Sequence, residues 1–240
     1  MIRTLIQYQL RRSIPSFAGS FILTFFTASL ASLILIQEWM EHIPSTIPIP
    51  MDILLLVLLP YFCGVYGGRE YWSFTTTRRD PFSHQLSYIR TLPISVEQFI
   101  SARFAILFVS VPILWTLFFG WNYMVLLIAG VHVPLFDYLS LSFIWLGYTI
   151  ALGGGFPFLE WSTSGKTFFW TPGLLLFLIV LITFYLNISL KFNLFRWTWS
   201  LAQEVGPLAA LISLLLGSLS LYGWYRLTLR RVKKRDLSLI

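Results

Sequence analysis

Ionisable side chains are the first candidates for chemistry in this sequence, and they avoid the middle of its long apolar runs. Glu38, Arg69, Glu70, Glu160 and Arg226 all fall near the ends of such runs. A membrane-embedded hydrolase needs paired acids, or a nucleophile with a base, within one site. A transporter coupled to ions or protons normally keeps ionisable residues inside its helix bundle. The runs contain many Ser and Thr residues but no His or carboxylate partner, which disfavours self-contained catalysis and ion coupling.

The composition indicates a membrane protein. Apolar residues make up 57% of the 240-residue chain and charged residues only 11%, against about 45–50% and about 25% in soluble proteins. The net charge of +7 comes from basic residues that lie beside apolar runs. Anionic lipid headgroups and membrane orientation account for this placement, so we expect the lipid bilayer, and no nucleic acid, as a partner.

Six apolar stretches approach the length of about 20 residues that a membrane-spanning helix requires. A basic amphipathic helix over residues 1–14, which we expect to be retained, precedes them. It either lies in the headgroup plane or is a charged anchor that only sets the orientation. We predict an all-α integral membrane protein that forms one transmembrane domain over 1–240. The six predicted spans are 16–38, 52–70, 102–128, 138–157, 172–190 and 207–226. They form three pairs: spans 1–2 within 16–70, spans 3–4 within 102–157, and spans 5–6 within 172–226.

The basic residues set the predicted orientation. The sequence holds 17 Lys and Arg residues. If both termini are cytoplasmic, all of them fall on the inner side except Lys191 and Arg196. Such an excess of inner positive charge is typical of cytoplasmic segments. Residues 227–240 then form a basic cytoplasmic tail.

The outer segment 191–206 is rich in aromatic residues. This pattern predicts either an interfacial aromatic belt, which is the more common arrangement, or a re-entrant pair of half-helices before the last span. Its candidate residues are Phe195, Arg196, Trp197, Trp199 and Glu204.

Cysteine and histidine leave one alternative function open. Cys63 is the single cysteine, which excludes an internal disulfide and a zinc or iron–sulfur framework. His42 and His132 both fall on the predicted outer side, where they could ligate haem as in a six-span haem-handling assembly factor or a membrane-embedded enzyme. Such haem-handling families carry a dense Trp-Asp motif in an outer loop, which this sequence lacks. Loop histidines are more often solvated side chains, and we predict no metal site.

The longest polar interval, residues 78–103, carries ordered helix signals. Asp80 can accept hydrogen bonds from the first free N–H groups of a helix, and Pro81 is tolerated at its first position. Apolar residues then recur at helical spacing. They predict a short amphipathic helix whose apolar face is formed by Phe82, Leu86 and Ile89.

A break and a second helix start follow. Leu92 precedes Pro93, and a residue before proline is pushed out of the helical region. Ser95, with Gln98 three residues on, forms a capping-box pattern. The second helix is expected to continue into the third span, so the interval predicts a helix, a break and a helix at the membrane surface.

These residues resemble a known family. In permease subunits of type-2 ABC transporters, an Arg-Glu pair follows the second span, and a cytoplasmic segment ending in a Leu-Pro-Ile-Ser-like motif leads through a basic residue into the third span. Here Arg69-Glu70, the segment 86–95 with Ser95 at its end, and Arg103 are similar to that pattern. The interval between Glu70 and Leu92 is longer than usual, and Arg103 stands where lysine is common.

The resemblance implies a function. The chain would be the membrane subunit of an exporter, with an ATPase subunit and a second permease copy or a related permease as partners, in the bacterial cytoplasmic membrane. The chain lacks a phosphate-binding loop, so it would not be an enzyme and would hold no cofactor; ATP and magnesium would bind to the ATPase. Segment 78–100 would be the coupling helix that docks on the ATPase, through Phe82, Leu86, Tyr88, Ile89, Arg90, Leu92 and Pro93.

The cargo is less defined. An apolar interior without charge favours an amphipathic or hydrophobic molecule, such as a peptide, a lipid-like molecule or a drug. The sequence assigns no substrate-binding residues.

Overall fold

The computed structural model describes residues 2–40, 49–64, 76–91 and 93–235, and every regular element in these ranges is a helix. Arg69, Glu70, His42 and Leu92 lie outside the described residues. The elements are α1 (Ile2–Met40), α2 (Ile49–Ile53), the π-helical turn η1 (Leu54–Leu58), α3 (Leu59–Gly64), α4 (Thr76–Arg79), α5 (Pro81–Thr91), α6 (Val96–Ile128), α7 (Leu135–Gly153), α8 (Gly155–Ser162), α9 (Gly165–Ser189) and α10 (Leu194–Lys234).

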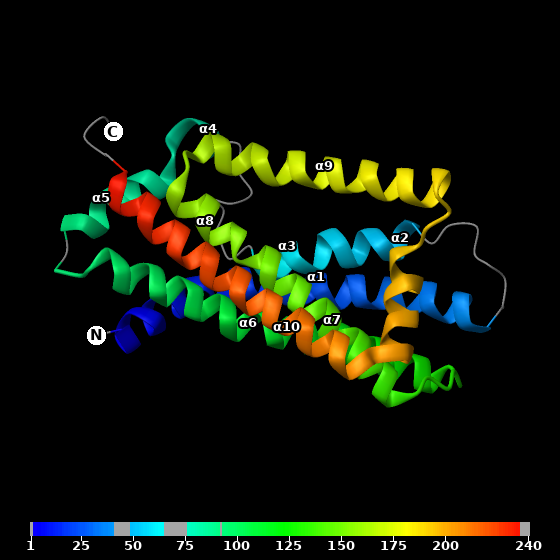
Figure 1. The fold of residues 1–240 in the computed structure, drawn as a ribbon. Coiled ribbons are helices and arrows are strands. Elements are labelled where there is room, and N and C mark those ends of the chain that lie inside the picture. Colours follow the sequence, from blue (N-terminus) through cyan, green and yellow to red (C-terminus); the bar gives the residue numbers. More distant parts are fainter. Residues whose placement is uncertain (1, 41–48, 65–75, 92, 236–240) are drawn as a thin grey trace.

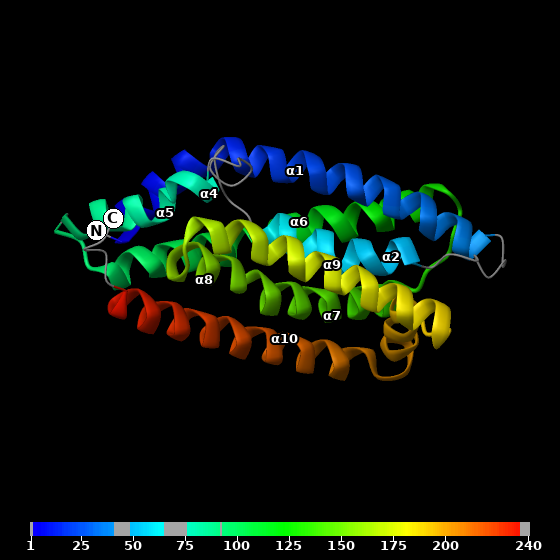
Figure 2. The same ribbon diagram turned by 90° about the horizontal axis from the view of Figure 1, so that it is seen from above.

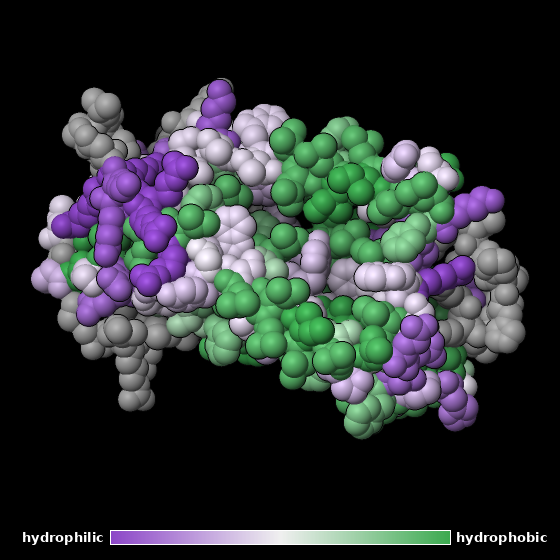
Figure 3. Space-filling model, viewed as in Figure 1, coloured by the Kyte–Doolittle hydropathy of each residue, from purple (hydrophilic) through white to green (hydrophobic). Residues whose placement is uncertain are grey.

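The long helices run side by side along one axis (Figures 1 and 2). The start of α1, the short helix α5 and the end of α10 lie at one end of the bundle, which we call the basic end because the last turn of α10 holds Arg231, Lys233 and Lys234. Apolar side chains cover the middle of the face in Figure 3, and hydrophilic side chains gather toward both ends. This distribution matches a body that crosses an apolar layer.

Five of the helical stretches described are long and apolar enough to cross a membrane, so the chain is an all-helical, multi-pass membrane protein. They are Phe17–Gln37, Val96–Ile128, Leu135–Ser162, Gly165–Ser189 and Leu194–Lys234. The predicted second span, 52–70, coincides in part with a shorter apolar helix, Pro50–Tyr61. The part of that span beyond residue 64 lies outside the described ranges, so a sixth crossing stays a prediction.

Two predicted boundaries differ from the structure. The expected separate interfacial helix over 1–14 is continuous with the first span, since α1 runs unbroken from Ile2 through Pro15 to Met40. The fourth predicted span, 138–157, is longer in the structure: the apolar stretch Leu135–Ser162 continues from α7 through Gly154 into α8.

The backbones of α7 and α10 approach each other closely. A Cβ atom on Gly147 would collide with the backbone of Ser213, and one on Gly217 would collide with the backbone of Gly147. The hydroxyl of Ser213 donates to the carbonyl of Ile144 over 2.7 Å. Small residues allow this approach, which is how helices gain dispersion contacts in a membrane, where lipid is as apolar as the side chains.

Pro60 leaves one backbone carbonyl without its helical donor in the helix formed by α2, η1 and α3. Pro60 has no N–H, so the carbonyl of Leu56, four residues earlier, loses its usual helical donor. The hydroxyl of Tyr148 on α7 donates to that carbonyl over 2.8 Å. An interhelical hydrogen bond therefore satisfies a backbone group that the proline leaves open.

Candidate functional site

The amphipathic helix that the sequence predicts is α5, and its start and the next helix start have the expected caps. Asp80 precedes the helix in a left-handed conformation (φ 37°), and its carboxylate accepts hydrogen bonds from the backbone N–H and the hydroxyl of Ser83. At the start of α6, the hydroxyl of Ser95 accepts from the N–H of Gln98 over 3.2 Å. Both predicted helix starts are confirmed.

The apolar face of α5 packs against the protein itself. Phe82, Leu86 and Ile89 are 1%, 0% and 5% exposed. The ring of Phe82 lies 4.8 Å from that of Phe168 on α9 and 6.2 Å from that of Trp161 on α8. Leu86 and Ile89 belong to a cluster with residues of α6, α8 and α10.

This burial changes which side chains can meet a partner. The sequence assigned Phe82, Leu86 and Ile89 to a docking surface, but the structure places all three inside the protein. An amphipathic pattern identifies the face that is buried, not the molecule that buries it. The exposed side of α5 carries His84, Tyr88, Arg90 and Thr91, and Pro93 is exposed just after the helix.

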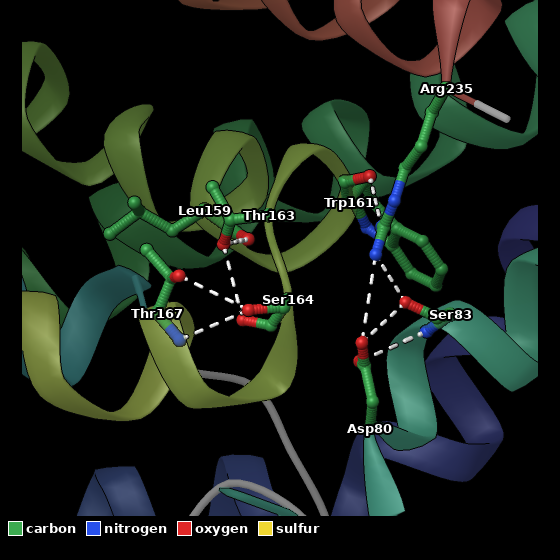
Figure 4. Close-up of polar contacts among 8 residues, drawn as sticks. All are labelled: Asp80, Ser83, Leu159, Trp161, Thr163, Ser164, Thr167 and Arg235. Atoms are coloured by element: carbon green, nitrogen blue, oxygen red, sulfur yellow. Dashed lines mark hydrogen bonds and ion pairs between the residues drawn. The ribbon is translucent and has the colours of Figure 1, made fainter. Parts of the chain in front are cut away.

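Arg235 ties the end of α10 to the start of α5 (Figure 4). Its guanidinium donates to the hydroxyl of Ser83 and, over 3.1 Å, to the carbonyl of Trp161. The same group lies 3.6 Å from the carboxylate of Asp80. Burial lowers the pKa of Arg235 from its ordinary value, and the Asp80 carboxylate acts against that shift. One side chain thus links α10, α5 and α8.

Arg90 makes a second link between the same elements. Its guanidinium donates to the carbonyls of Val232 and Arg235, over 2.7 and 3.0 Å. The last carbonyls of a helix have no intrahelical partner and carry partial negative charge, so a cation placed there stabilises the helix end. Arg90, which the sequence assigned to docking, therefore caps the end of α10.

A buried ion pair lies next to this junction. Nε of Arg103 on α6 donates to the carboxylate of Glu160 on α8 over 3.0 Å, and the two residues are 5% and 2% exposed. Removing one partner of such a pair leaves a buried charge. Arg103 was singled out in the sequence, but Glu160 was identified only as lying near a span end. Their shared position at the ends of two spans was the available signal.

The opposite end of the bundle holds a buried acid that the sequence did not single out. Asp52 is 1% exposed. Its carboxylate accepts hydrogen bonds from the backbone N–H groups of Leu194 and Phe195, over 3.1 and 2.8 Å, and from the side-chain amide of Asn187 over 3.1 Å. Asp52 thus holds the start of α10 and the end of α9 against α2.

The aromatic outer segment forms one helical stretch rather than a pair of half-helices. Residues 194–204 are helical, and Val205 has non-helical backbone angles (φ −136°, ψ 29°) just before Pro207. Figures 1 and 2 show this first part of α10 turned across the end of the bundle. Of its candidate residues, Phe195 is buried, Trp199 is half-buried, and Arg196, Trp197 and Glu204 are exposed.

A pocket of about 190 Å³ lies between α3, α8 and α9. Nearly all of its lining side chains are aliphatic or aromatic. No group of three or more His, Cys, Asp or Glu residues within the described ranges could hold a metal ion. His132 is exposed in the connection before α7, and its proposed partner His42 lies outside the described residues.

Comparisons with known proteins add no assignment. No family model, no curated protein and no solved structure matches this chain.

Proposed function

We propose that this chain is the permease subunit of an ATP-binding-cassette exporter in the cytoplasmic membrane, and that α5 is the element through which a separate ATPase acts on it. The multi-pass helical body supports a transport role in general terms. The resemblance of the segment 69–103 to type-2 permeases supports the particular class. In this proposal the basic end faces the cytoplasm, where the ATPase holds ATP and magnesium.

The observation that carries the proposal is the way α5 is held. It contacts α8 and α9 through Phe82, and the end of α10 through Arg90 and the Asp80–Arg235 pair. Its buried leucine and isoleucine pack in a cluster that includes the start of α6. Any force on α5 therefore acts on several membrane helices at once, which is what a coupling helix requires.

The exposed side of α5 then becomes the docking face. His84, Tyr88 and Thr91 recur at helical spacing on that side, and Tyr88 is 65% exposed. A tyrosine offers a large apolar ring and a hydroxyl at little conformational cost, which suits the centre of an interface. We place Tyr88 at the centre of the contact with the ATPase.

Co-purification tests this proposal. A tagged chain is isolated from native membranes in mild detergent, and the soluble proteins bound to it are identified by mass spectrometry. A parallel preparation carries Tyr88→Glu, which places a charge on the docking face without disturbing the buried face. The control is Lys166→Gln, which lowers the net charge by the same amount at an exposed position of α9.

We expect an ATP-hydrolysing subunit with the wild type and with Lys166→Gln, and its loss from Tyr88→Glu. Substitution of a central tyrosine in an interface costs about 2 kcal/mol or more, or about thirtyfold in affinity. If no ATPase accompanies the wild type under conditions that preserve other membrane complexes, the proposal is wrong. If an ATPase binds equally to Tyr88→Glu, the docking face lies elsewhere.

A further inference from the structure

The pocket between α3, α8 and α9 is lined by two prolines and by a glycine that opens α8. These residues are Pro60 on α3, Pro172 on α9 and Gly155 at the start of α8. Figure 3 shows the surface hollowed beneath α9, between apolar side chains.

The pocket offers almost nothing to a polar ligand. Tyr61, Thr171 and Trp224 are its lining residues with polar side-chain atoms. The indole N–H of Trp224 already donates to the carbonyl of Ala151 over 2.9 Å. An ordered water needs about two to four polar partners, so water is a poor occupant and an apolar group is a good one.

The depth of the pocket identifies the source of that group. On α9 the lining runs from Thr171 to Ile179, while the helix starts at Gly165 beside Asp80 at the basic end. At 1.5 Å per residue, the pocket spans about 9 to 21 Å from that start. A hydrocarbon core is about 30 Å thick, so this interval is the level of lipid acyl chains rather than headgroups.

The size of the pocket limits what it can hold. Drug-sized ligands occupy pockets of about 300–1,000 Å³, and an apolar cavity of about 150 Å³ accepts benzene. A pocket of about 190 Å³ is therefore suited to a section of one narrow, flexible chain.

We propose that this pocket, which lies at the depth of the lipid acyl chains, binds one acyl chain of a membrane phospholipid. This acyl chain enters from the lipid beneath α9 and lies against Phe156 and Leu159 of α8. This binding is a property of the membrane subunit alone and does not depend on the transporter proposal.

Cross-linking tests the binding directly. The purified full chain is placed in lipid nanodiscs that contain a phosphatidylcholine with a photoactivatable diazirine at mid-chain, and cross-links are mapped by mass spectrometry. The yield at Phe156 and Leu159 is normalised to that at Leu219 of α10, which is 66% exposed and meets bulk lipid in any case. We expect clear labelling of α8 in the wild type.

Two tryptophan variants of α9 separate pocket binding from general contact with lipid. Leu176→Trp fills the pocket, while Leu178→Trp adds the same ring at a position that is 47% exposed and does not line it. Labelling of α8 should fall about tenfold, or about 1.4 kcal/mol, in Leu176→Trp and remain at the wild-type level in Leu178→Trp. Ile179→Trp, which fills the pocket further along α9, replaces Leu176→Trp if that protein does not fold.

Either of two results would overturn the proposal. Labelling of Leu219 without labelling of α8 in the wild type would mean that no chain enters the pocket. An equal fall in the pocket-filling and control variants would mean that the labelled chain lies on the surface of α9.

Discussion

Asp52 should be the most sensitive polar residue at the end of the bundle opposite α5. Replacing it by Ala removes the acceptor of three hydrogen bonds, from the N–H groups of Leu194 and Phe195 and from the amide of Asn187. Hydrogen bonds inside membrane proteins average about 0.6 kcal/mol each, whereas a buried donor left without an acceptor costs about 1–3 kcal/mol. We therefore expect a loss in the free energy of unfolding of about 2 kcal/mol if water reaches the three freed donors, and of about 3–9 kcal/mol if it does not.

Denaturant titration in detergent, followed by tryptophan fluorescence, measures this loss. The control is Asp137→Ala, which removes an acid from the first turn of α7, where the helix dipole accounts for only about 0.3–1 kcal/mol. Hydrogen exchange supplies a local readout, because the amides of Leu194 and Phe195 should exchange faster in Asp52→Ala alone. Equal destabilisation by the two variants, with unchanged exchange at these amides, would refute the account of Asp52 as a cap that acts across helices.

Three other predictions test the packing at the basic end and between α7 and α10. Arg103→Met and Glu160→Gln should each destabilise the protein by about 3–5 kcal/mol, and the double variant by less than their sum, because each single change leaves a buried charge; additive losses in a thermal unfolding series would contradict the pairing. Arg235→Ala should increase hydrogen exchange throughout α5, and Arg235→Lys should restore only part of the protection, since lysine lacks the planar fork that reaches several acceptors; unchanged exchange in α5 would show that other contacts hold it. Gly147→Ala should lower stability by more than about 1–3 kcal/mol, the usual cost of overpacking, whereas Gly223→Ala, where a Cβ atom meets nothing within 4 Å, should have little effect; similar unfolding midpoints would rule out the close backbone contact.

Local chemistry made parts of this structure predictable. Asp80 with Pro81, and Ser95 with Gln98, specify helix starts within a few residues, so both starts could be located without knowing the fold. The length and hydropathy of the runs similarly identified the five long candidate spans. The second span stays a prediction, because the apolar helix in its described part, Pro50–Tyr61, is shorter than a membrane crossing requires.

Contacts between distant residues could not be predicted in this way. The burial of Leu86 depends on residues of α8 and α10 that are far away in the sequence, and an amphipathic pattern is the same whether a helix packs on its own protein or on a partner. Asp52 pairs with groups more than 100 residues away. Asp52 lies near the start of an apolar helix, and only its charge distinguishes it in the sequence, so its partners could not be predicted. Pro207, in contrast, was a visible signal for the kink in α10.

The attachment of α9 has a mechanical consequence. Gly165 packs against Thr76 and Asp80 at one end of this helix, and Asn187 is hydrogen-bonded to Asp52 near the other. Among its 25 residues only Gly165, Phe168 and Thr183 are buried. The helix is therefore held near its two ends, and the lateral pressure of the bilayer acts on the exposed length between them. A thinner or thicker membrane should tilt or bow α9 before it disturbs the tightly packed pair α7 and α10, so bilayer thickness would set the width of the space behind it.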